Sequence, residues 1–395
     1  MKILILSFFF RPDLGAGSFR ATALVKALKT KAPHAEIRVL TTLPNRYQSF
    51  SVDAPEHESS QGVSITRVTL PAHKSGILDQ SKAFLHFAWR VRDLIRSEHY
   101  DLVFATSSRL MTAVLGAWVA RRKGCPLYLD IRDIFVDTIK DVLPSGIARI
   151  SKFFFSFLER WAVNSAVKVN LVSGGFKKYF ESRYPDQRFS YYTNGIDDEF
   201  LAVVPKAVSP VKTPMAKEPL VALYAGNLGE GQGLHEILPP LAKRCEGRVH
   251  FKVFGDGGRK EQLLSKLTEM EISNVKILPP IPRDALIKEY QLADILFLHL
   301  GNYDAFHKVL PSKVFEYGAL GKPIWAGIPG FSADFVRSEL DNTAVFPPCS
   351  IDDAMNVLET LQIQDRPRIA FVQKYSRDVI CREMAADILV TTRAK

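Results

Sequence analysis

Three glycine-rich turns contain the first residues of this chain whose type and spacing suggest chemistry. They occupy residues 12–18, 224–234 and 254–258, and each follows an apolar run and precedes a helical pattern. Glycine lets the backbone approach a phosphate closely, and the free N–H groups at a helix start attract anionic oxygens. The turns are therefore candidate sites for a phosphorylated ligand, beginning with Gly15 and Gly17 in the first of them.

Each turn also has a plainer interpretation. A dinucleotide-binding turn looks similar, but its G-x-G-x-x-G pattern is incomplete here because Arg20 stands where the third glycine would be. A simple tight turn needs glycine without any ligand. One such turn would be unremarkable, whereas three, distributed over both halves of the chain, favour a phosphorylated ligand.

The segment from Leu310 to Pro323 combines a helix start with an unusual charge. Ser312 is placed to cap the helix and Gly321 to end it. Lys313, in the first turn, faces the positive end of the helix dipole, an unfavourable position unless a diphosphate binds there. Glu316 is three residues further on, so a surface ion pair with Lys313 is the alternative. We favour ligand binding, with the Glu316 carboxylate accepting hydrogen bonds from ribose hydroxyls.

The elements that must position these residues alternate between apolar runs and helical patterns twice along the chain, which predicts two α/β domains with parallel sheets. We expect strands at 2–8, 36–41, 63–68, 101–106, 126–131, 167–172, 220–225, 249–254, 275–278, 295–299, 323–326 and 344–346. We expect helices at 18–29, 82–98, 110–122, 146–164, 234–244, 260–270, 283–291 and 314–320.

The expected domains are residues 1–203 and 220–375, joined by a proline-rich linker at 204–219. The closing segment 376–395 carries a helical apolar stripe that should pack back on the first domain. Ligands of doubly wound sheets bind at the carboxyl ends of the strands, so the two sheets should leave a cleft for the ligand between them.

Composition restricts the remaining possibilities. With 47% hydrophobic and 24% charged residues, the chain of 395 residues is not disordered. The widely spaced cysteines (Cys125, Cys245, Cys349 and Cys381) form no C-x-x-C metal pair or dense disulfide framework, which favours a reduced, cytoplasmic setting. No uncharged stretch approaches the roughly 20 residues that span a bilayer, so any membrane contact should be peripheral.

The net charge of +10 implies an anionic partner, and the excess is concentrated in 72–178, with 17 Lys and Arg against 9 Asp and Glu. Within this stretch, the helix at 146–163 places Ile147, Ile150, Phe154, Leu158 and Trp161 on one stripe, with Arg149, Lys152 and Arg160 on the other side. It could lie on an anionic membrane or pack on the sheet as a core helix. A second candidate patch comprises Phe84, Phe87, Trp89, Arg90 and Arg92. The basic residues lack the context of a nucleic-acid-binding module, so we expect no nucleic-acid partner.

Three motifs follow one another along the chain: the segment Tyr192-Thr193-Asn194-Gly195-Ile196-Asp197, the glycine-rich loop at 224–234 and the Pro-Ser-Lys-x-Phe-Glu-Tyr helix start at 311–317. Together and in this order they resemble the retaining glycosyltransferases of the GT-B fold, family four. The resemblance covers essentially the whole chain and implies two Rossmann-like domains facing a central cleft. It implies that the second domain binds a nucleotide sugar and the first binds the acceptor. It further implies that Glu316 binds ribose, that Gly15 and Gly17 face the diphosphate, and that Gly257 lines the donor pocket.

The sequence departs from the family pattern at several positions. Lys308 replaces the first glutamate of the family's E-x7-E pattern. Asn227 and Gln232, in the loop that begins with Gly226, stand where the family commonly has an arginine and a lysine that bind the diphosphate. We therefore expect Lys313 to supply the missing cation, and we attribute these changes to a subfamily that resembles aminosugar transferases of surface-polysaccharide assembly.

Arg132 and Asp133 lie near the positions of a His-Asp pair that faces the transferred sugar in many relatives. Arg132 could stabilise the departing phosphate or contact the acceptor, and Asp133 could bind sugar hydroxyls. The alternative is a salt-bridged surface cluster at a strand end.

We therefore predict a hexosyl- or N-acetylhexosaminyl-type transferase that moves a sugar from a nucleotide-diphosphate sugar, UDP-linked rather than GDP-linked, to a lipid-linked or saccharide acceptor. Lys313, Arg132 and Asp133 are the expected catalytic residues. No D-x-D sequence occurs, so we expect catalysis without a metal or another cofactor, at the cytoplasmic face of the membrane if the basic helices contact lipid. The alternatives are a nucleotide-sugar epimerase of the same fold and a non-catalytic nucleotide-sugar-binding subunit.

Overall fold

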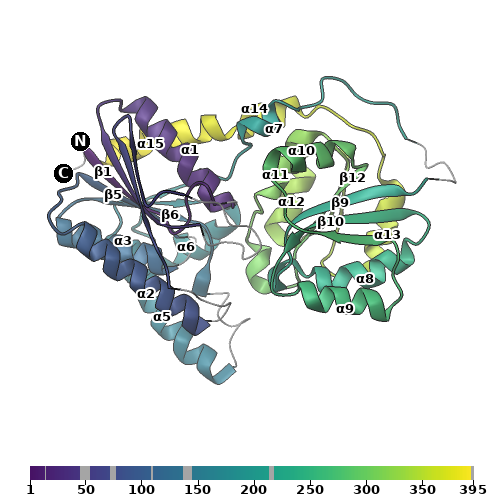
Figure 1. Ribbon diagram of the computed structural model, residues 1–395, viewed down its shortest axis with the longest axis horizontal. Helices are drawn as coiled ribbons and strands as arrows, with labels where there is room; N and C mark the ends of the chain where they lie inside the picture. Colours follow the sequence, from purple (N-terminus) through teal and green to yellow (C-terminus); the bar gives the residue numbers. More distant parts are fainter. Residues whose placement is uncertain are drawn as a thin grey trace. The chain divides into compact units, whose positions relative to one another are not determined.

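The computed structural model describes residues 1–13, 15–44, 54–71, 77–107, 110–136, 145–212 and 218–392, with side chains from 79 onward in the second helix and from 151 onward in the fifth. The chain forms two compact units (Figure 1). The first unit comprises Met1–Asn194 and Arg377–Lys395, and the second comprises Gly195–Ser376. Each unit contains one sheet with helices around it, which confirms the predicted pair of parallel-sheet α/β domains.

The sheet of the first unit has the strand order β3-β4-β2-β1-β5-β6-β7-β8. All described pairings are parallel except β3 with β4 at the edge. The strands are β1 (Lys2–Leu6), β2 (Glu36–Thr42), β3 (His57–Ser60), β4 (Val63–Val68), β5 (Leu102–Ser107), β6 (Leu127–Ile131), β7 (Lys168–Leu171) and β8 (Phe189–Ser190).

The helices of this unit are α1 (Ala16–Lys31), α2 (Ile77–Leu94), α3 (Leu110–Lys123), α5 (Ser145–Ser165), α6 (Lys177–Arg183) and α15 (Arg377–Thr391), with a 3-10 turn at Gly174–Phe176. Figure 1 shows α1 and α15 along one side of the sheet and α2, α3 and α5 along the other. The terminal helix α15 packs against α1 in one core cluster, in which Met384 and Ile388 contribute from α15 and Leu24 and Leu28 from α1.

The sheet of the second unit is parallel throughout its described pairings, in the order β11-β10-β9-β12-β13-β14. Its strands are β9 (Leu220–Asn227), β10 (Val249–Asp256), β11 (Val275–Leu278), β12 (Ile295–His299), β13 (Ile324–Gly327) and β14 (Thr343–Phe346). Its helices are α7 (Asp198–Leu201), α8 (Leu234–Arg244), α9 (Lys260–Glu269), α10 (Arg283–Leu292), α11 (Lys313–Leu320), α12 (Gly330–Glu339), α13 (Ile351–Thr360) and α14 (Ile369–Tyr375), with 3-10 turns at Glu230–Gln232 and Asp304–His307.

The structure contains elements that the sequence analysis did not predict, namely strands β3 and β8 and helices α6, α7, α12, α13 and α14. Strand β3 has the sequence HESS and no apolar alternation, so a periodicity argument has nothing to detect there. Helix α2 ends at Leu94 rather than at residue 98, because the backbone closes into tighter turns in which the amides of Arg96 and Glu98 donate to the carbonyls of Asp93 and Ile95.

The segment expected to be a linker is part of the second unit, whose boundary lies earlier, after Asn194. The amide of Ser209 donates to the carbonyl of Asp365 at 3.0 Å, and that of Lys212 donates to the carbonyl of Ile363 at 2.8 Å. These hydrogen bonds attach the described part of 204–219 to the segment that precedes α14.

The buried residue Arg20 organises the carboxyl edge of the first sheet. Its guanidinium donates from Nε and Nη2 to the two carboxylate oxygens of Asp130, both at 2.9 Å, and to the carbonyls of Tyr192 and Thr193. Burial opposes the charge of Asp130, but the adjacent Arg20 guanidinium outweighs this and holds the pKa of that carboxyl below its ordinary value. The arginine that interrupts the glycine pattern thus joins α1 to β6 and to the start of the Tyr192–Asp197 motif.

This ion pair gives a test of stability. In Asp130→Asn the buried guanidinium loses its counter-charge, and we expect the free energy of unfolding to fall by about 3–5 kcal/mol. The control is Glu36→Gln, which removes an exposed carboxylate 3.7 Å from Lys2 and should cost about 1 kcal/mol or less. Chemical denaturation measures both variants. Equal losses in the two would contradict the central role of the Arg20–Asp130 pair.

Candidate functional site

The ammonium group of Lys313 lies against the backbone of Gly226 in the second unit. Gly226 is near the end of β9 with φ of 153°, and a Cβ atom there would be 2.5 Å from Lys313 Nζ and 2.8 Å from its Cε. Only glycine leaves room for the lysine in this position. The structure therefore brings together the first turn of α11 and the glycine turn after β9, two features that the sequence separates by almost ninety residues.

Tyr224, which lies on β9 like Gly226, contacts Lys313 with its ring. Its ring centre is 5.7 Å from Lys313 Nζ, and its hydroxyl donates to the carbonyl of Asn227 at 2.9 Å. Within the described part of the chain, Lys313 has no ion pair with a carboxylate, so the alternative Lys313–Glu316 pair is absent there. A half-buried cation over an aromatic ring and a bare backbone is available for an anion.

Asn227 and Gln232 bind each other across the loop. The Asn227 side-chain amide donates to Gln232 Oε1 at 2.9 Å, which closes the turn around the short 3-10 segment. Gly257, at the end of the next strand, lies so close that a Cβ atom would be 2.7 Å from Asn227 Oδ1. Gly226, Asn227, Gln232, Gly257 and Lys313 therefore form one cluster at the carboxyl ends of β9 and β10.

His299 is part of this cluster and was missed in the sequence analysis. It is fully buried at the end of β12, and its Nε2 accepts a hydrogen bond from the amide of Cys349 at 3.1 Å. That contact assigns the proton to Nδ1, which donates to the carbonyl of Gln232 at 2.7 Å. Burial lowers the pKa of the imidazole to about 4, so the ring is neutral near pH 7 and pins the glycine loop to the neighbouring strand. The only feature of the sequence that could have pointed to this residue is that a histidine ends an apolar strand.

Glu316 is held by an arginine rather than by Lys313. Its Oε1 is 3.7 Å from an Nη of Arg283, which also forms an ion pair with Asp197. Burial disfavours the charge of Arg283, but the carboxylates of Glu316 and Asp197 raise the pKa of the guanidinium above its ordinary value. Arg283 was not singled out from the sequence, although it begins α10 and carries the same signal that marked Lys313, a cation at a helix start. The last residue of the Tyr192–Asp197 motif is thereby linked to the α11 helix.

The candidates of the first unit form a separate group. Gly15 precedes α1, and Gly17 lies in its first turn, where a Cβ atom would be 3.6 Å from an Nη of Arg132. The same guanidinium donates to the carbonyl of Ala16 at 3.3 Å, and burial lowers its pKa to about 10. Asp133 is exposed beside it. Arg132 is thus positioned at the glycine turn, whereas the neighbouring Asp130 is buried with Arg20 and is not part of a surface cluster.

One group of side chains has metal-ligating types. Among the described residues, Glu230, His235 and Glu236 offer ligand atoms within 4.8 Å of one another. Glu230 is already engaged by Arg259 and by the Tyr303 hydroxyl, and burial lowers the pKa of His235. These contacts satisfy the carboxylate without a metal, and the group does not include any predicted donor-site residue.

Two family models match successive parts of the chain. A glycosyl transferase 4-like domain matches residues 15–195, and the glycosyl transferases group 1 model matches residues 206–375. WcaI of Escherichia coli, which is assigned as a glycosyl transferase of colanic acid biosynthesis, is 23% identical to this chain over 338 residues. The match covers 81% of this chain and 82% of WcaI. WbjE of Pseudomonas aeruginosa, assigned as a glycosyltransferase, is 21% identical over 333 residues, covering 80% and 81%.

Solved structures share the fold. A sucrose-phosphate synthase from Thermosynechococcus elongatus superposes with a TM-score of 0.75 at 14% identity, covering 100% of both chains. HepE of Anabaena in complex with UDP gives a TM-score of 0.58 at 17% identity, covering 100% of this chain and 98% of HepE. With both units matched by their models, the chain belongs to the glycosyltransferases of the GT-B fold, as predicted. No described helix combines the length and apolar character needed to cross a bilayer.

The titration of His299 gives a testable pH dependence. Because its folded-state pKa of about 4 lies below the ordinary value of 6.5, the unfolded chain binds the proton more readily between these values. The neutral ring therefore makes its full contribution to the free energy of unfolding above a pH of about 6.5. This contribution, about 3 kcal/mol, is lost as the pH falls towards 4. The free energy of unfolding of His299→Gln should not show this decrease, so a plot of its stability against pH should converge with that of the wild type as the pH falls. The exposed-residue control His250→Gln should keep the wild-type slope, and parallel curves for His299→Gln and wild type would contradict the assignment.

Proposed function

We propose that this glycosyltransferase transfers a sugar, with retention of anomeric configuration and without a metal, from a nucleotide-diphosphate sugar to a lipid-linked saccharide acceptor. A UDP-sugar with a hexosyl or N-acetylhexosaminyl group is the proposed donor. The relative WcaI, assigned to colanic acid biosynthesis, supports a saccharide product, and the similarly folded HepE in complex with UDP supports a UDP-linked donor. The four cysteines, all in the described part of the chain, form no disulfide bond, which suits a reducing compartment, so we place the reaction on the cytoplasmic side, in surface-polysaccharide or glycolipid synthesis.

The position of Lys313 is the single observation that carries the donor proposal. Its ammonium lies at the N-terminus of α11 and against the bare backbone of Gly226. Helix dipole and ammonium both favour an anion at this point, and the diphosphate carries its charge where both act. Without an anion, the two positive features would repel each other.

Glu316 is proposed to accept hydrogen bonds from the ribose hydroxyls. The Arg283 guanidinium lies 3.7 Å from this carboxylate and holds it in place, while its contact with Asp197 anchors the arginine itself. An ionised carboxylate is an acceptor for both vicinal hydroxyls of a ribose. Asn227, Gln232 and Gly257 would then shape the loop around the diphosphate rather than neutralise it.

In the transfer itself, the bond between the anomeric carbon and the diphosphate oxygen breaks, and that oxygen takes the bonding electrons. The ring becomes oxocarbenium-like while negative charge grows on the leaving group. Lys313 and the loop amides stabilise that charge in place of a metal, in line with the lack of a D-x-D sequence. The acceptor oxygen would form its bond to the anomeric carbon on the face that the leaving phosphate departs from, and that phosphate would accept the proton of the acceptor hydroxyl, which gives retention. Arg132 and Asp133, at the glycine turn of α1, are the proposed contacts to phosphate and sugar hydroxyls.

Removal of the two donor-site charges tests this proposal. Lys313→Ala and Glu316→Ala should each weaken UDP binding by at least about tenfold, because a charge-assisted contact to the diphosphate or ribose is lost. The control Lys276→Ala removes an exposed lysine from β11 and should bind UDP like the wild type.

The measurement is ligand-induced thermal stabilisation across a panel of UDP- and GDP-sugars, since a bound ligand raises stability by mass action. Unchanged UDP affinity in both variants would refute the placement of the donor. Assays with and without lipid-linked acceptors add a second readout, because nucleotide release with sugar epimerised or with no transfer would contradict a transferase.

Gly226→Ala tests the steric part of the same site. The added methyl group would push the Lys313 ammonium away from the backbone, so UDP affinity should fall by about tenfold or more. Gly247→Ala is a matched control, because Gly247 also has a positive φ, of 73°, but its added Cβ meets no atom within 4 Å. Both variants should lose about 1–3 kcal/mol of stability from backbone strain. Equal UDP affinity in the two would contradict a role for the Lys313–Gly226 contact.

A further inference from the structure

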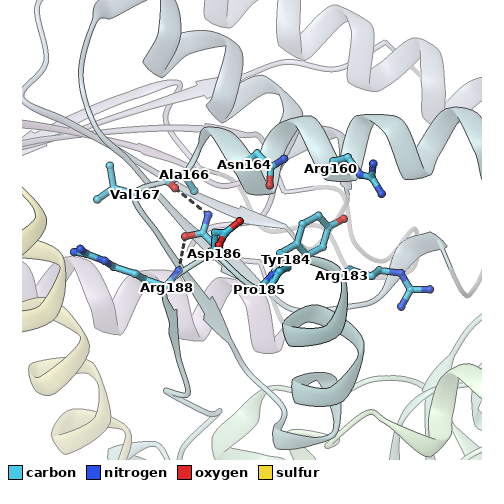
Figure 2. A pocket seen from close by; sticks show the side chains of 10 residues that line it. Arg160, Asn164, Ala166, Val167, Arg183, Tyr184, Pro185, Asp186 and Arg188 are labelled. Atoms are coloured by element: carbon cyan, nitrogen blue, oxygen red, sulfur yellow. Dashed lines mark hydrogen bonds between the residues drawn. The ribbon is translucent and has the colours of Figure 1, made fainter.

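A hollow with polar walls lies at the C-terminal end of α5. It has a volume of about 540 Å³ and is lined by residues of the segments 160–167 and 183–188 (Figure 2). Val167 comes directly before β7 and Arg188 directly before β8, so the hollow lies at the amino edge of the first sheet. Arg132 follows β6, which is parallel to β7, and therefore lies at the opposite, carboxyl edge. The hollow is thus separate from the candidate residues of the first unit, and its volume suits a small ligand.

Helix α5 turns Arg160 and Asn164 outwards at this end. The two residues are four positions apart, so they share one side of the helix, and both are exposed. The inward side is occupied by Ala162 and Val163, which are 1% exposed. The packing of α5 on the rest of the unit therefore decides that a cation and an amide face the hollow.

The structure corrects the candidate patches that the sequence analysis placed on α5 and α2. On α5, Phe154 is 56% exposed, whereas Leu158 and Trp161 of the same predicted stripe are half-buried. On α2, Phe84 and Phe87 are buried, because their rings pack on the segment that follows β1. The exposed side chains at the C-terminal end of α5 are the polar ones that line the hollow. Outside the described side chains lie Ile147, Arg149 and Ile150.

Two guanidinium groups lie together at this hollow. Figure 2 shows Arg160 and Arg183 extending to the same side, whereas Arg188 extends the other way. Burial and the carboxylate of Glu159 raise the pKa of the Tyr184 hydroxyl, and the charges of both Arg160 and Arg183 oppose this rise, so both cations lie near one atom. Within the described residues neither arginine forms an ion pair with a carboxylate. Their charge is therefore available to an anionic ligand.

The floor beneath these arginines is fixed by buried hydrogen bonds. The hydroxyls of Tyr179 and Tyr184 both donate to the buried carboxylate of Glu159, at 3.1 and 2.9 Å. Arg183 lies 3.7 Å over the centre of the Tyr179 ring, and its Nη1 donates to the carbonyl of Tyr179 at 3.3 Å. An arginine that is already held in place loses less side-chain entropy when it binds a ligand.

The remaining polar side chains suit hydroxyl groups. Gln187 closes the wall, since its amide donates to the carbonyl of Ala166 at 3.0 Å and its Oε1 accepts from the amide of Arg188 at 2.7 Å. Asn164 and Asp186 also line the hollow and are exposed. A carboxamide donates and accepts hydrogen bonds and a carboxylate accepts them, so both match the hydroxyls of a sugar.

We propose that this hollow binds a small phosphate ester that carries hydroxyl groups, of the class of a sugar phosphate. The planar guanidinium groups of Arg160 and Arg183 would bind the phosphate oxygens in pairs, and Asn164 and Asp186 would bind the hydroxyls. The site is distinct from the donor site, because it belongs to the first unit and shares no residue with the cluster around Lys313. The proposal therefore does not depend on the proposed function.

The test is isothermal titration calorimetry of the full chain with glucose 1-phosphate, glucose 6-phosphate and ribose 5-phosphate, alongside inorganic phosphate and glucose. At least one sugar phosphate should bind more tightly than inorganic phosphate, and glucose should bind more weakly than either. Arg160→Gln/Arg183→Gln should weaken sugar-phosphate binding by at least about tenfold, because two charge-assisted contacts are lost. The control Arg90→Gln/Arg92→Gln removes the same charge from exposed positions of α2 and should bind like the wild type.

Two further variants locate the ligand. Lys313→Ala should keep the wild-type affinity for the sugar phosphate, because the donor site is not involved. Asn164→Ala should weaken sugar-phosphate binding and leave the binding of inorganic phosphate unchanged, and circular dichroism checks that each variant is folded.

Three results would overturn the proposal. The first is that the wild type binds none of the three sugar phosphates, or binds them no better than inorganic phosphate. The second is wild-type affinity in the folded Arg160→Gln/Arg183→Gln variant. The third is a loss of binding in Lys313→Ala, which would place the phosphate at the donor site instead.

Discussion

A lysine ammonium placed against a backbone without a side chain is the constraint on which the donor site depends. Lys313 can occupy its position only because residue 226 is glycine, and it occupies the end of a helix where a cation is disfavoured. The surrounding contacts serve this arrangement: Tyr224 lies beneath the ammonium, and Asn227, Gln232 and His299 close the loop next to it. A bound anion would interact favourably with both the Lys313 ammonium and the helix dipole, which otherwise repel each other.

Both units place a cation next to a glycine turn, but its contacts differ. In the second unit Lys313 lies against Gly226 and over the Tyr224 ring, whereas in the first unit the Arg132 guanidinium donates to the carbonyl of Ala16 at the start of α1. The buried Arg20–Asp130 pair fixes β6, the strand that directly precedes Arg132. Arg20 also binds the carbonyls of the Tyr192–Asp197 motif, whose last residue anchors Arg283 and through it Glu316. Both ends of this motif are therefore held by arginine side chains, the first end by Arg20 and the last by Arg283.

Sequence patterns were sufficient for most of the architecture. Most of the parallel strands are short apolar runs, and this signal is present in the sequence because both faces of such sheets are buried. Strand β3 was out of reach, since its four polar residues lie at an edge and pair with one neighbour only. For helix α5, periodicity gave the helix but not its orientation: apolar residues surround the described part of it, so the packing of Phe155 on Phe135 decides which phenylalanines are exposed.

The residues of the candidate site also fall into those that the sequence marks locally and those that only the folded structure reveals. Glycines after strands and a lysine at a helix start are local signals, and Gly226, Gly257 and Lys313 were found from them. Arg283 also begins a helix but was not singled out, and His299 carries no such signal. The roles of these two residues come from contacts with Glu316 and Gln232, which lie far away in the sequence. No local pattern encodes such a pairing.

A crystal structure of the protein with bound UDP tests the central claim most directly. The account predicts that the diphosphate lies at the N-terminus of α11 with one of its oxygens in ion-pair distance of Lys313 Nζ, and that the ribose hydroxyls contact Glu316. A UDP molecule bound with its diphosphate remote from Lys313, while the Lys313–Gly226 contact is intact, would contradict it.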